Sequence, residues 1–204
     1  MSTLTPMETL KAATGSWHDA LEAHAHSHQI MDLSLPREGF ERLICFQYSL
    51  HQAVEPLIRP LLDENFPELA YGETRQKMEA LQADIMQLDP AQRPPEVSAH
   101  FIQSPAHALG SAYVLEGSTL GGQVILRHLK KMPDIARDEP FRYYGLYGDQ
   151  VGPRWKTFQK VTNTALDTSE KLGEATEAAV ATFKLACEIY EIMESELLNA
   201  GQSR

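Results

Sequence analysis

Residues 117–122 read Gly-Ser-Thr-Leu-Gly-Gly and lie inside a longer stretch, 105–131, that is otherwise strongly apolar and typical of a helix. Each glycine inside a helix costs roughly 1 kcal/mol relative to alanine, so three glycines in six positions need a physical reason. One reason is the close packing of another helix. The other is a large, flat ligand lying against the backbone where a Cβ would collide with it, and glycines also permit a kink that turns peptide groups toward a ligand. These residues alone leave both explanations open.

The sequence on both sides of this stretch is also helical in pattern. Thr5, Pro6 and Glu8 form the signature of a helix start, with Thr5 as the N-cap and Glu8 reaching back to it. We expect further helices, with an irregular segment at 133–152 and a proline-rich loop at 89–98. The expected helices span residues 5 to about 28, 37 to about 55 (ended or kinked by Pro56 and Pro60), 73–88, 104–131 with interruptions, 153–166 and 169–199. We therefore predict a single all-α domain over residues 1–204.

Composition excludes several classes of protein. The chain has 204 residues, with 18 Lys and Arg against 28 Asp and Glu, which gives a net charge of −10 and argues against general nucleic-acid binding. A chain of this length buries roughly 70% of its unfolded surface, enough to enclose a ligand. Cys45 and Cys187 are far apart in apolar stretches, so we expect core residues in a reducing, cytoplasmic setting. We expect no membrane-spanning helix and no secretory signal, because no run of about 18 apolar residues exists and residues 1–11 lack a signal pattern.

Three side chains of the first helix share one face. At about 100° per residue, His18 and Glu22 each lie within about 20° of Lys11 around the helix. A carboxylate four residues after a histidine can accept a hydrogen bond from one ring nitrogen and leave the other free to bind a metal. The pair is equally compatible with an ordinary surface contact.

Other charged residues carry weaker signals. His24, His26 and His28 suggest a metal site, but on a helix only His24 and His28 would share a face, and all three are compatible with a helix C-terminus. Lys156 and Lys160 are also i,i+4 neighbours, and they could be solvated surface or hold an anion. The sequence shows no phosphate-binding loop, dinucleotide fingerprint or zinc-protease motif.

Taken together, these segments resemble the heme oxygenases, in particular the bacterial enzymes that produce biliverdin. The stretch 113–124, Tyr-Val-Leu-Glu-Gly-Ser-Thr-Leu-Gly-Gly-Gln-Val, is similar to the distal helix of that family and is the most specific part of the resemblance. The remaining similar segments are 10–14 with His18 and Glu22 (the proximal helix), 37–40, 154–160 and 183–198. The resemblance implies an all-α fold in which heme lies between a proximal helix and a kinked distal helix.

The resemblance also implies roles for individual residues. His18 matches the proximal ligand of the heme iron and Glu22 its hydrogen-bond partner, while Gly117 and Gly121 match the distal glycines whose backbone lies on the heme. Ser118 stands where animal enzymes have an aspartate that organises water over the iron. The positions that match residues facing the heme propionates are Lys11, Tyr113, Lys156 and Lys160.

The implied activity is oxidative cleavage of heme, which is both cofactor and substrate, to biliverdin, CO and ferrous iron. It consumes O₂ and needs electrons from a donor such as a ferredoxin, flavodoxin or reductase, and the biliverdin could supply a phytochrome. A neutral imidazole holds the iron without the electron push of a thiolate, which agrees with this chemistry. A di-iron oxidase or a thiaminase-like hydrolase does not explain the distal glycines, whereas a non-catalytic heme carrier or sensor of the same fold would share all of these residues.

Overall fold

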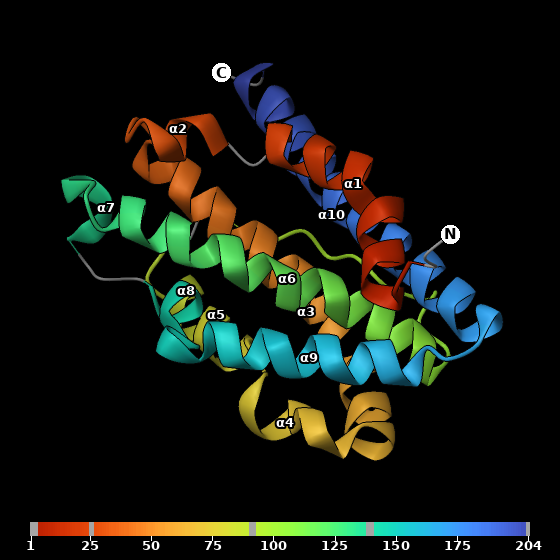
Figure 1. The fold of residues 1–204 in the computed structure, drawn as a ribbon. Coiled ribbons are helices and arrows are strands. Elements are labelled where there is room, and N and C mark those ends of the chain that lie inside the picture. Colours follow the sequence, from red (N-terminus) through yellow and green to blue (C-terminus); the bar gives the residue numbers. More distant parts are fainter. Residues whose placement is uncertain (1–3, 25–26, 90–92, 138–140, 203–204) are drawn as a thin grey trace.

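The protein, described by a computed structural model, consists of helices joined by short segments (Figure 1). The structure describes residues 4–24, 27–89, 93–137 and 141–202. Within these ranges there is no strand, which confirms the predicted all-α class. The helices are α1 (Pro6–His24), α2 (Ser27–Met31), α3 (Arg37–Asn65), α4 (Tyr71–Thr74), α5 (Met78–Ile85), α6 (Pro105–Leu129), α7 (Pro133–Ala136), α8 (Arg142–Gly145), α9 (Val151–Ala165) and α10 (Ser169–Gln202), with short 3₁₀ turns at Pro67–Leu69 and Gly148–Gln150.

Helix α6 lies at the centre of the arrangement, packed on α10, α3, α8 and α9 (Figure 1). Its crossing with α10 is close at Gly110, where an added Cβ would lie 2.0 Å from the carbonyl oxygen of Ala175. Helix α1 packs on α10 and α9, so α10 supports both α1 and α6. The two helices that carry the sequence motifs are therefore held by a common partner.

Helix α1 begins as the sequence predicts. The backbone N–H of Thr5 donates to the Glu8 carboxylate at 2.7 Å, and the N–H of Glu8 donates to the Thr5 hydroxyl at 3.3 Å. This reciprocal pair satisfies two N–H groups that have no partner within the helix. The expected end near His28 was too late, because α1 ends at His24 and Ser27–Met31 forms the separate helix α2.

Of the two expected effects of Pro56 and Pro60, ending the second helix was wrong, and a kink stays a prediction. Helix α3 continues through both prolines to Asn65. Both prolines face solvent, where water can satisfy the carbonyl groups that lose their helical partner. The opposite side of the helix presents the buried residues Val54, Ile58 and Leu62 at i, i+4 and i+8, and their burial holds the helix together across the prolines.

Two other boundaries also differ from expectation. The helix expected at 73–88 is interrupted between α4 and α5, and the side chains of Arg75 and Lys77 turn inward at the break. The segment 133–152, expected to be irregular, contains the short helices α7 and α8 and a 3₁₀ turn. Residues 93–98 of the predicted loop are without helix, while residues 90–92 lie outside the described part of the chain.

The expectation that the two cysteines are core residues is met. Both cysteines are buried and unpaired, and burial raises the pKa of the Cys45 thiol to about 12, so it is a core residue. Among the residues that the structure describes, no helix combines the length and apolar character that crossing a membrane requires.

Candidate functional site

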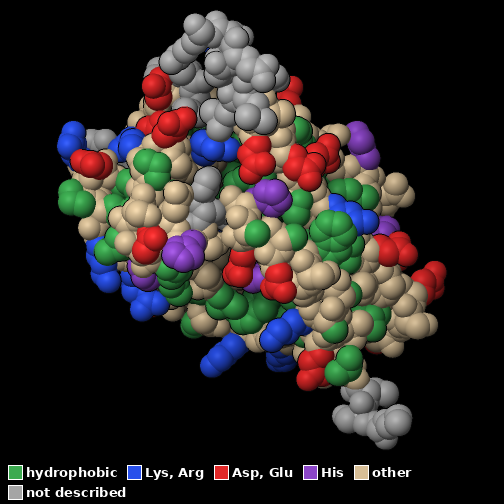
Figure 2. All heavy atoms as spheres, turned by 90° about the horizontal axis from the view of Figure 1, so that it is seen from above, with side chains coloured by type: hydrophobic (Ala, Val, Ile, Leu, Met, Phe, Trp, Pro, Cys, Tyr) green, Lys and Arg blue, Asp and Glu red, His purple; other side chains and the backbone are tan. Residues whose placement is uncertain are grey.

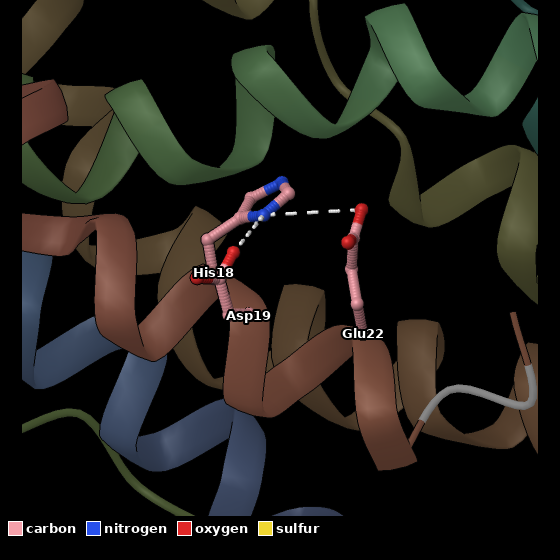
Figure 3. Close-up of side chains that lie close together, drawn as sticks. All are labelled: His18, Asp19 and Glu22. Carbon is pink, nitrogen blue, oxygen red and sulfur yellow. Dashed lines mark ion pairs between the residues drawn. The ribbon is translucent and has the colours of Figure 1, made fainter.

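The exposed face of α1 carries the first part of the site. Viewed from above, the molecule shows histidine and acidic side chains beside a band of hydrophobic ones, with Lys and Arg side chains along the edge (Figure 2). The Nδ1 atom of His18 lies 3.8 Å from Oε1 of Glu22 and 3.9 Å from Oδ1 of Asp19, and the three side chains are 57%, 62% and 85% exposed. The prediction that His18 and Glu22 share a face is thus confirmed, and Asp19 joins them. The side chains of His18 and Glu22 point from α1 toward α6 (Figure 3).

The glycines of α6 have different surroundings. Gly122 is buried, and a Cβ there would lie 3.4 Å from the Tyr144 ring, so packing explains this glycine. A Cβ at Gly117 would make only an ordinary contact, 3.6 Å from the Trp155 ring, and a Cβ at Gly121 would have no atom within 4 Å. Packing within the described chain therefore gives no reason for glycine at Gly117 or Gly121. The second explanation, a ligand lying against this helix, is the one that these two positions favour.

Helix α6 is helical throughout Pro105–Leu129, so the expected interruptions are absent. The glycines are accompanied by two hydroxyls that bond back to the helix. Ser118 donates to the carbonyl oxygen of Leu115 at 2.8 Å, and Thr119 donates to that of Glu116 at 2.6 Å. Such side-chain bonds to preceding carbonyls bend helices slightly. The kink expected near Ser118 stays a prediction.

The four residues expected near the propionates lie on three helices. Tyr113 of α6 is half-buried with its ring centroid 6.0 Å from that of Trp155 on α9; burial raises the pKa of Tyr113, and the Thr14 side chain on α1 opposes this shift. Lys11, Lys156 and Lys160 are exposed. Across the described parts of the chain, none of these three lysines lies within ion-pair distance of a carboxylate. They are therefore free to meet an anionic ligand, and their role stays a prediction.

Directly behind the glycines lies a buried cluster of charges that the sequence reasoning missed. The Glu116 carboxylate accepts hydrogen bonds from Lys77 Nζ and the Tyr147 hydroxyl, each at 2.8 Å, and from the Arg75 guanidinium. Glu116, Arg75 and Lys77 are each at most 2% exposed. Burial alone would raise the pKa of Glu116, but Lys77 and Arg75 hold it below its usual value. Burial likewise opposes the charge on Lys77, but Glu116 raises its pKa well above the ordinary value.

A second buried group connects to the first. Nδ1 of His51 lies 2.7 Å from Glu55, and Nε2 lies 3.2 Å from the Tyr143 hydroxyl, which donates to Gln47 Oε1 at 2.8 Å. Glu55 also accepts the backbone N–H of Lys77 at 3.0 Å, which joins the two groups. Burial lowers the pKa of His51, so the ring is neutral, with Nδ1 donating to Glu55 and a lone pair on Nε2.

The buried group reaches the glycine-rich face through a small cavity. Its volume of about 20 Å³ has room for one water molecule. Ser118 and Gly122 of α6 line it together with Lys77, Tyr143 and Tyr147. Residues with hydroxyl groups, Ser118, Tyr143 and Tyr147, thus line one cavity. A surface groove of about 1010 Å³ between α5, α7 and α8 lies elsewhere and is wide open.

Signals for the missed residues were present in the sequence. His51 and Glu55 have the same i,i+4 spacing as His18 and Glu22, and Glu116 is the one acidic residue of the mainly apolar helix α6. The His51–Glu55 pair is buried whereas the His18–Glu22 pair is exposed, and the spacing alone does not reveal this difference. Arg75 and Lys77 gave no such signal, because the break between α4 and α5 was not expected.

Among the histidines that the structure describes, the remaining ones form no shared site. His24 stacks on Tyr190 with ring centroids 6.0 Å apart and lies 3.4 Å from Glu194, while His28 lies 3.2 Å from Asp32. Because α1 ends at His24, the expected common face of His24 and His28 does not form. His26 lies outside the described residues.

Comparisons with known proteins identify the family. The sequence model of the family described as heme oxygenase matches residues 5–192. A heme oxygenase of Xanthomonas campestris pv. campestris (strain 8004) is 34% identical over 114 residues, which cover 53% of this chain and 64% of that relative; the matched region thus spans less than two thirds of the relative's length.

Solved structures show the same fold. The NO- and CO-bound heme oxygenase from Neisseria meningitidis has a TM-score of 0.69 at 23% identity, covering 92% of this chain and 91% of its own. The heme oxygenase from Leptospira interrogans has a TM-score of 0.74 at 14% identity, covering 92% and 98%. These likenesses establish the fold, and the family match extends over nearly the whole sequence. The chain belongs to the heme oxygenase family.

Proposed function

We propose that the protein cleaves heme to biliverdin, CO and ferrous iron, using O₂ and electrons from an external donor of the ferredoxin, flavodoxin or reductase type. The observation that carries the proposal is the pair of glycines, Gly117 and Gly121, that have no packing reason and lie on the helix toward which His18 points. A flat macrocycle needs such a surface, because a Cβ on this side would hold it away from the backbone. The residues present therefore fit heme.

On the proximal side, His18 would bind the iron. A neutral imidazole uses Nε2 for a metal when Nδ1 carries the proton, and Glu22, 3.8 Å from Nδ1, is placed to accept a hydrogen bond from that N–H once the two side chains move closer. Bound heme supplies the site of oxygen activation and is itself the substrate that is opened. The exposure of His18 allows the ligand to enter from solvent.

On the distal side, the chain supplies space and protons. The Tyr143 hydroxyl has one proton and two neighbouring acceptors, Gln47 Oε1 and His51 Nε2. With Glu55 holding Nδ1–H, the Nε2 lone pair of His51 faces the Tyr143 hydroxyl, and Tyr143 lines the cavity shared with Ser118. We propose that these hydroxyls, rather than a carboxylate on α6, hold the water that passes protons from solvent toward the heme.

The mouth of the site requires cations because heme carries two propionates and the protein has a net charge of −10. Lys11, Lys156 and Lys160, with the Tyr113 hydroxyl, are the proposed anchors. Exposed ion pairs contribute little each, so their proposed role is to fix the rotation of heme about the iron–His18 axis and thereby the carbon that is attacked.

The test is a heme titration followed by a chemical reductant under air, recorded by absorption. The expected result is a saturable 1:1 complex whose heme bands give way to those of biliverdin. A complex whose heme spectrum persists through reduction in air would instead identify a carrier or sensor and refute the enzymatic proposal. The reaction would serve iron acquisition through the released iron, or supply biliverdin as a phytochrome chromophore.

A further inference from the structure

Asp19 has no part in the heme-binding arrangement, yet it completes a set of three metal-binding side chains. His18, Asp19 and Glu22 each offer one ligand atom, and these atoms lie within 4.8 Å of one another. Figure 3 shows both carboxylates beside the imidazole, each joined to Nδ1 by an ion-pair contact. In the described parts of the chain, this is the one group of three or more such residues with that geometry.

The geometry suits a divalent cation. The Nδ1 atom of His18 lies 3.9 and 3.8 Å from one oxygen of Asp19 and of Glu22, and ligand atoms of all three side chains lie within 4.8 Å of one another. Two zinc–nitrogen or zinc–oxygen bonds of 2.0–2.2 Å span at most about 4.4 Å, so a small side-chain adjustment lets all three hold one cation. One imidazole and two carboxylates also match the ligand preferences of ferrous iron, cobalt and zinc. All three side chains are exposed, so water can fill the remaining coordination positions.

We propose that, in the heme-free protein, His18, Asp19 and Glu22 form a divalent-cation site that takes ferrous iron. The source of the iron is the reaction proposed above, which frees it beside His18, and this part of the inference rests on that proposed function. The acidic balance of the chain, −10, favours a cation at an exposed site with two carboxylates.

The site makes the cation and heme mutually exclusive. The cation binds Nδ1, the nitrogen that faces both carboxylates. A neutral imidazole with a metal on Nδ1 carries its proton on Nε2, and that nitrogen then has no lone pair for the heme iron. Heme binding needs the opposite arrangement, with the proton on Nδ1. Released iron therefore delays the binding of the next heme until it leaves His18.

Cobalt(II) chloride is a suitable probe, because it is close to ferrous iron in its ligand preferences and stable in air. The heme-free protein is titrated by calorimetry and by visible absorption. Asp19→Asn removes one ligand and one charge. Glu194→Gln is the matched control, since it removes one charge from a histidine pair with a single carboxylate, His24–Glu194 at 3.4 Å.

We expect one cobalt ion per wild-type chain, binding weakened roughly tenfold or more by Asp19→Asn, and unchanged binding in the control. Heme is then titrated with and without cobalt. At a cobalt concentration ten times its dissociation constant, the apparent heme dissociation constant of the wild type rises about 11-fold for full exclusion. In Asp19→Asn the same cobalt concentration produces a much smaller rise.

Equal cobalt binding in the wild type and Asp19→Asn would overturn the inference. An apparent heme dissociation constant that bound cobalt leaves unchanged would overturn it as well. The first titration involves no heme, so its failure leaves the proposed enzymatic function intact. Conversely, a wild-type protein that binds cobalt through Asp19 but never converts heme to biliverdin would refute the proposed function and leave the cation site standing.

Discussion

Glu116→Gln tests the buried charge cluster behind α6. The wild-type group contains two cations, Arg75 and Lys77, and two carboxylates, Glu116 and Glu55, so its charge is 2 − 2 = 0 with His51 neutral. The glutamine has nearly the same shape and retains one acceptor oxygen, but it leaves one positive charge uncompensated. Removing one partner of a buried ion pair typically costs about 3–5 kcal/mol of unfolding free energy. That is a large share of a typical domain's stability of roughly 5–15 kcal/mol.

The pH dependence of stability provides a second, independent test of this charge cluster. The folded-state pKa of Glu116 lies below its unfolded value, so its contribution is present above about pH 4.5 and is lost as pH falls through the folded pKa. The pKa of Lys77 is raised, so its contribution is present below the unfolded pKa near 10.5 and is lost only as pH rises through the higher folded value. The stabilisation therefore holds between these limits, and Glu116→Gln should flatten the acid side of the wild-type profile.

Urea unfolding followed by circular dichroism measures both effects. The matched surface control is Asp167→Asn, which removes a carboxylate 2.8 Å from Lys171 Nζ in an exposed i,i+4 pair and should leave the unfolding midpoint unchanged within error. If Glu116→Gln unfolds at the same urea concentration as the wild type at pH 7, the cluster does not hold charge in the way described. An unaltered acid profile in Glu116→Gln would lead to the same conclusion.

Three further changes test the heme site. His18→Ala should lose the imidazole-ligated heme spectrum and most turnover, with added imidazole partly restoring the spectrum; an unchanged spectrum and rate would place the iron ligand elsewhere. Gly121→Phe should reduce the yield of biliverdin sharply while heme still binds, because the ring occupies the open space beside α6; a normal yield measured by product absorption would refute close contact at this backbone. Lys11→Ala combined with Lys156→Ala should mix the biliverdin isomers separated by chromatography, and a single unchanged isomer with unchanged heme affinity would show that these lysines are only solvated surface.

The proximal half of the site could be read from sequence because helical geometry alone decides it. His18 and Glu22 are four residues apart on a helix whose start is marked by Thr5 and Glu8, and no tertiary contact is needed to bring them together. For the glycines, the sequence shows that a close neighbour is needed but does not say whether it is a helix or a ligand. Only the positions of neighbouring helices distinguish Gly122, which packs against Tyr144, from Gly121, where a Cβ would meet no atom of the described residues within 4 Å.

The distal interior could not be predicted because it depends on tertiary burial. Local rules end a helix at Pro56, whereas the packing of Val54 and Ile58 carries α3 onward and sets His51 and Glu55 inside the protein. Similarly, good helix formers around Lys77 predict an unbroken helix. The ion pair with Glu116, almost forty residues away in sequence, favours the break instead.

The most direct test of heme cleavage at this site is the stoichiometry of a single turnover, measured with catalase present to remove free peroxide. Heme bound to the wild-type protein is reduced in air, and CO, ferrous iron and biliverdin are each quantified per heme consumed. We expect one of each per heme, and none from His18→Ala under the same conditions. Loss of the heme absorption without CO, or equal CO from His18→Ala, would contradict cleavage of heme between His18 and the glycines of α6.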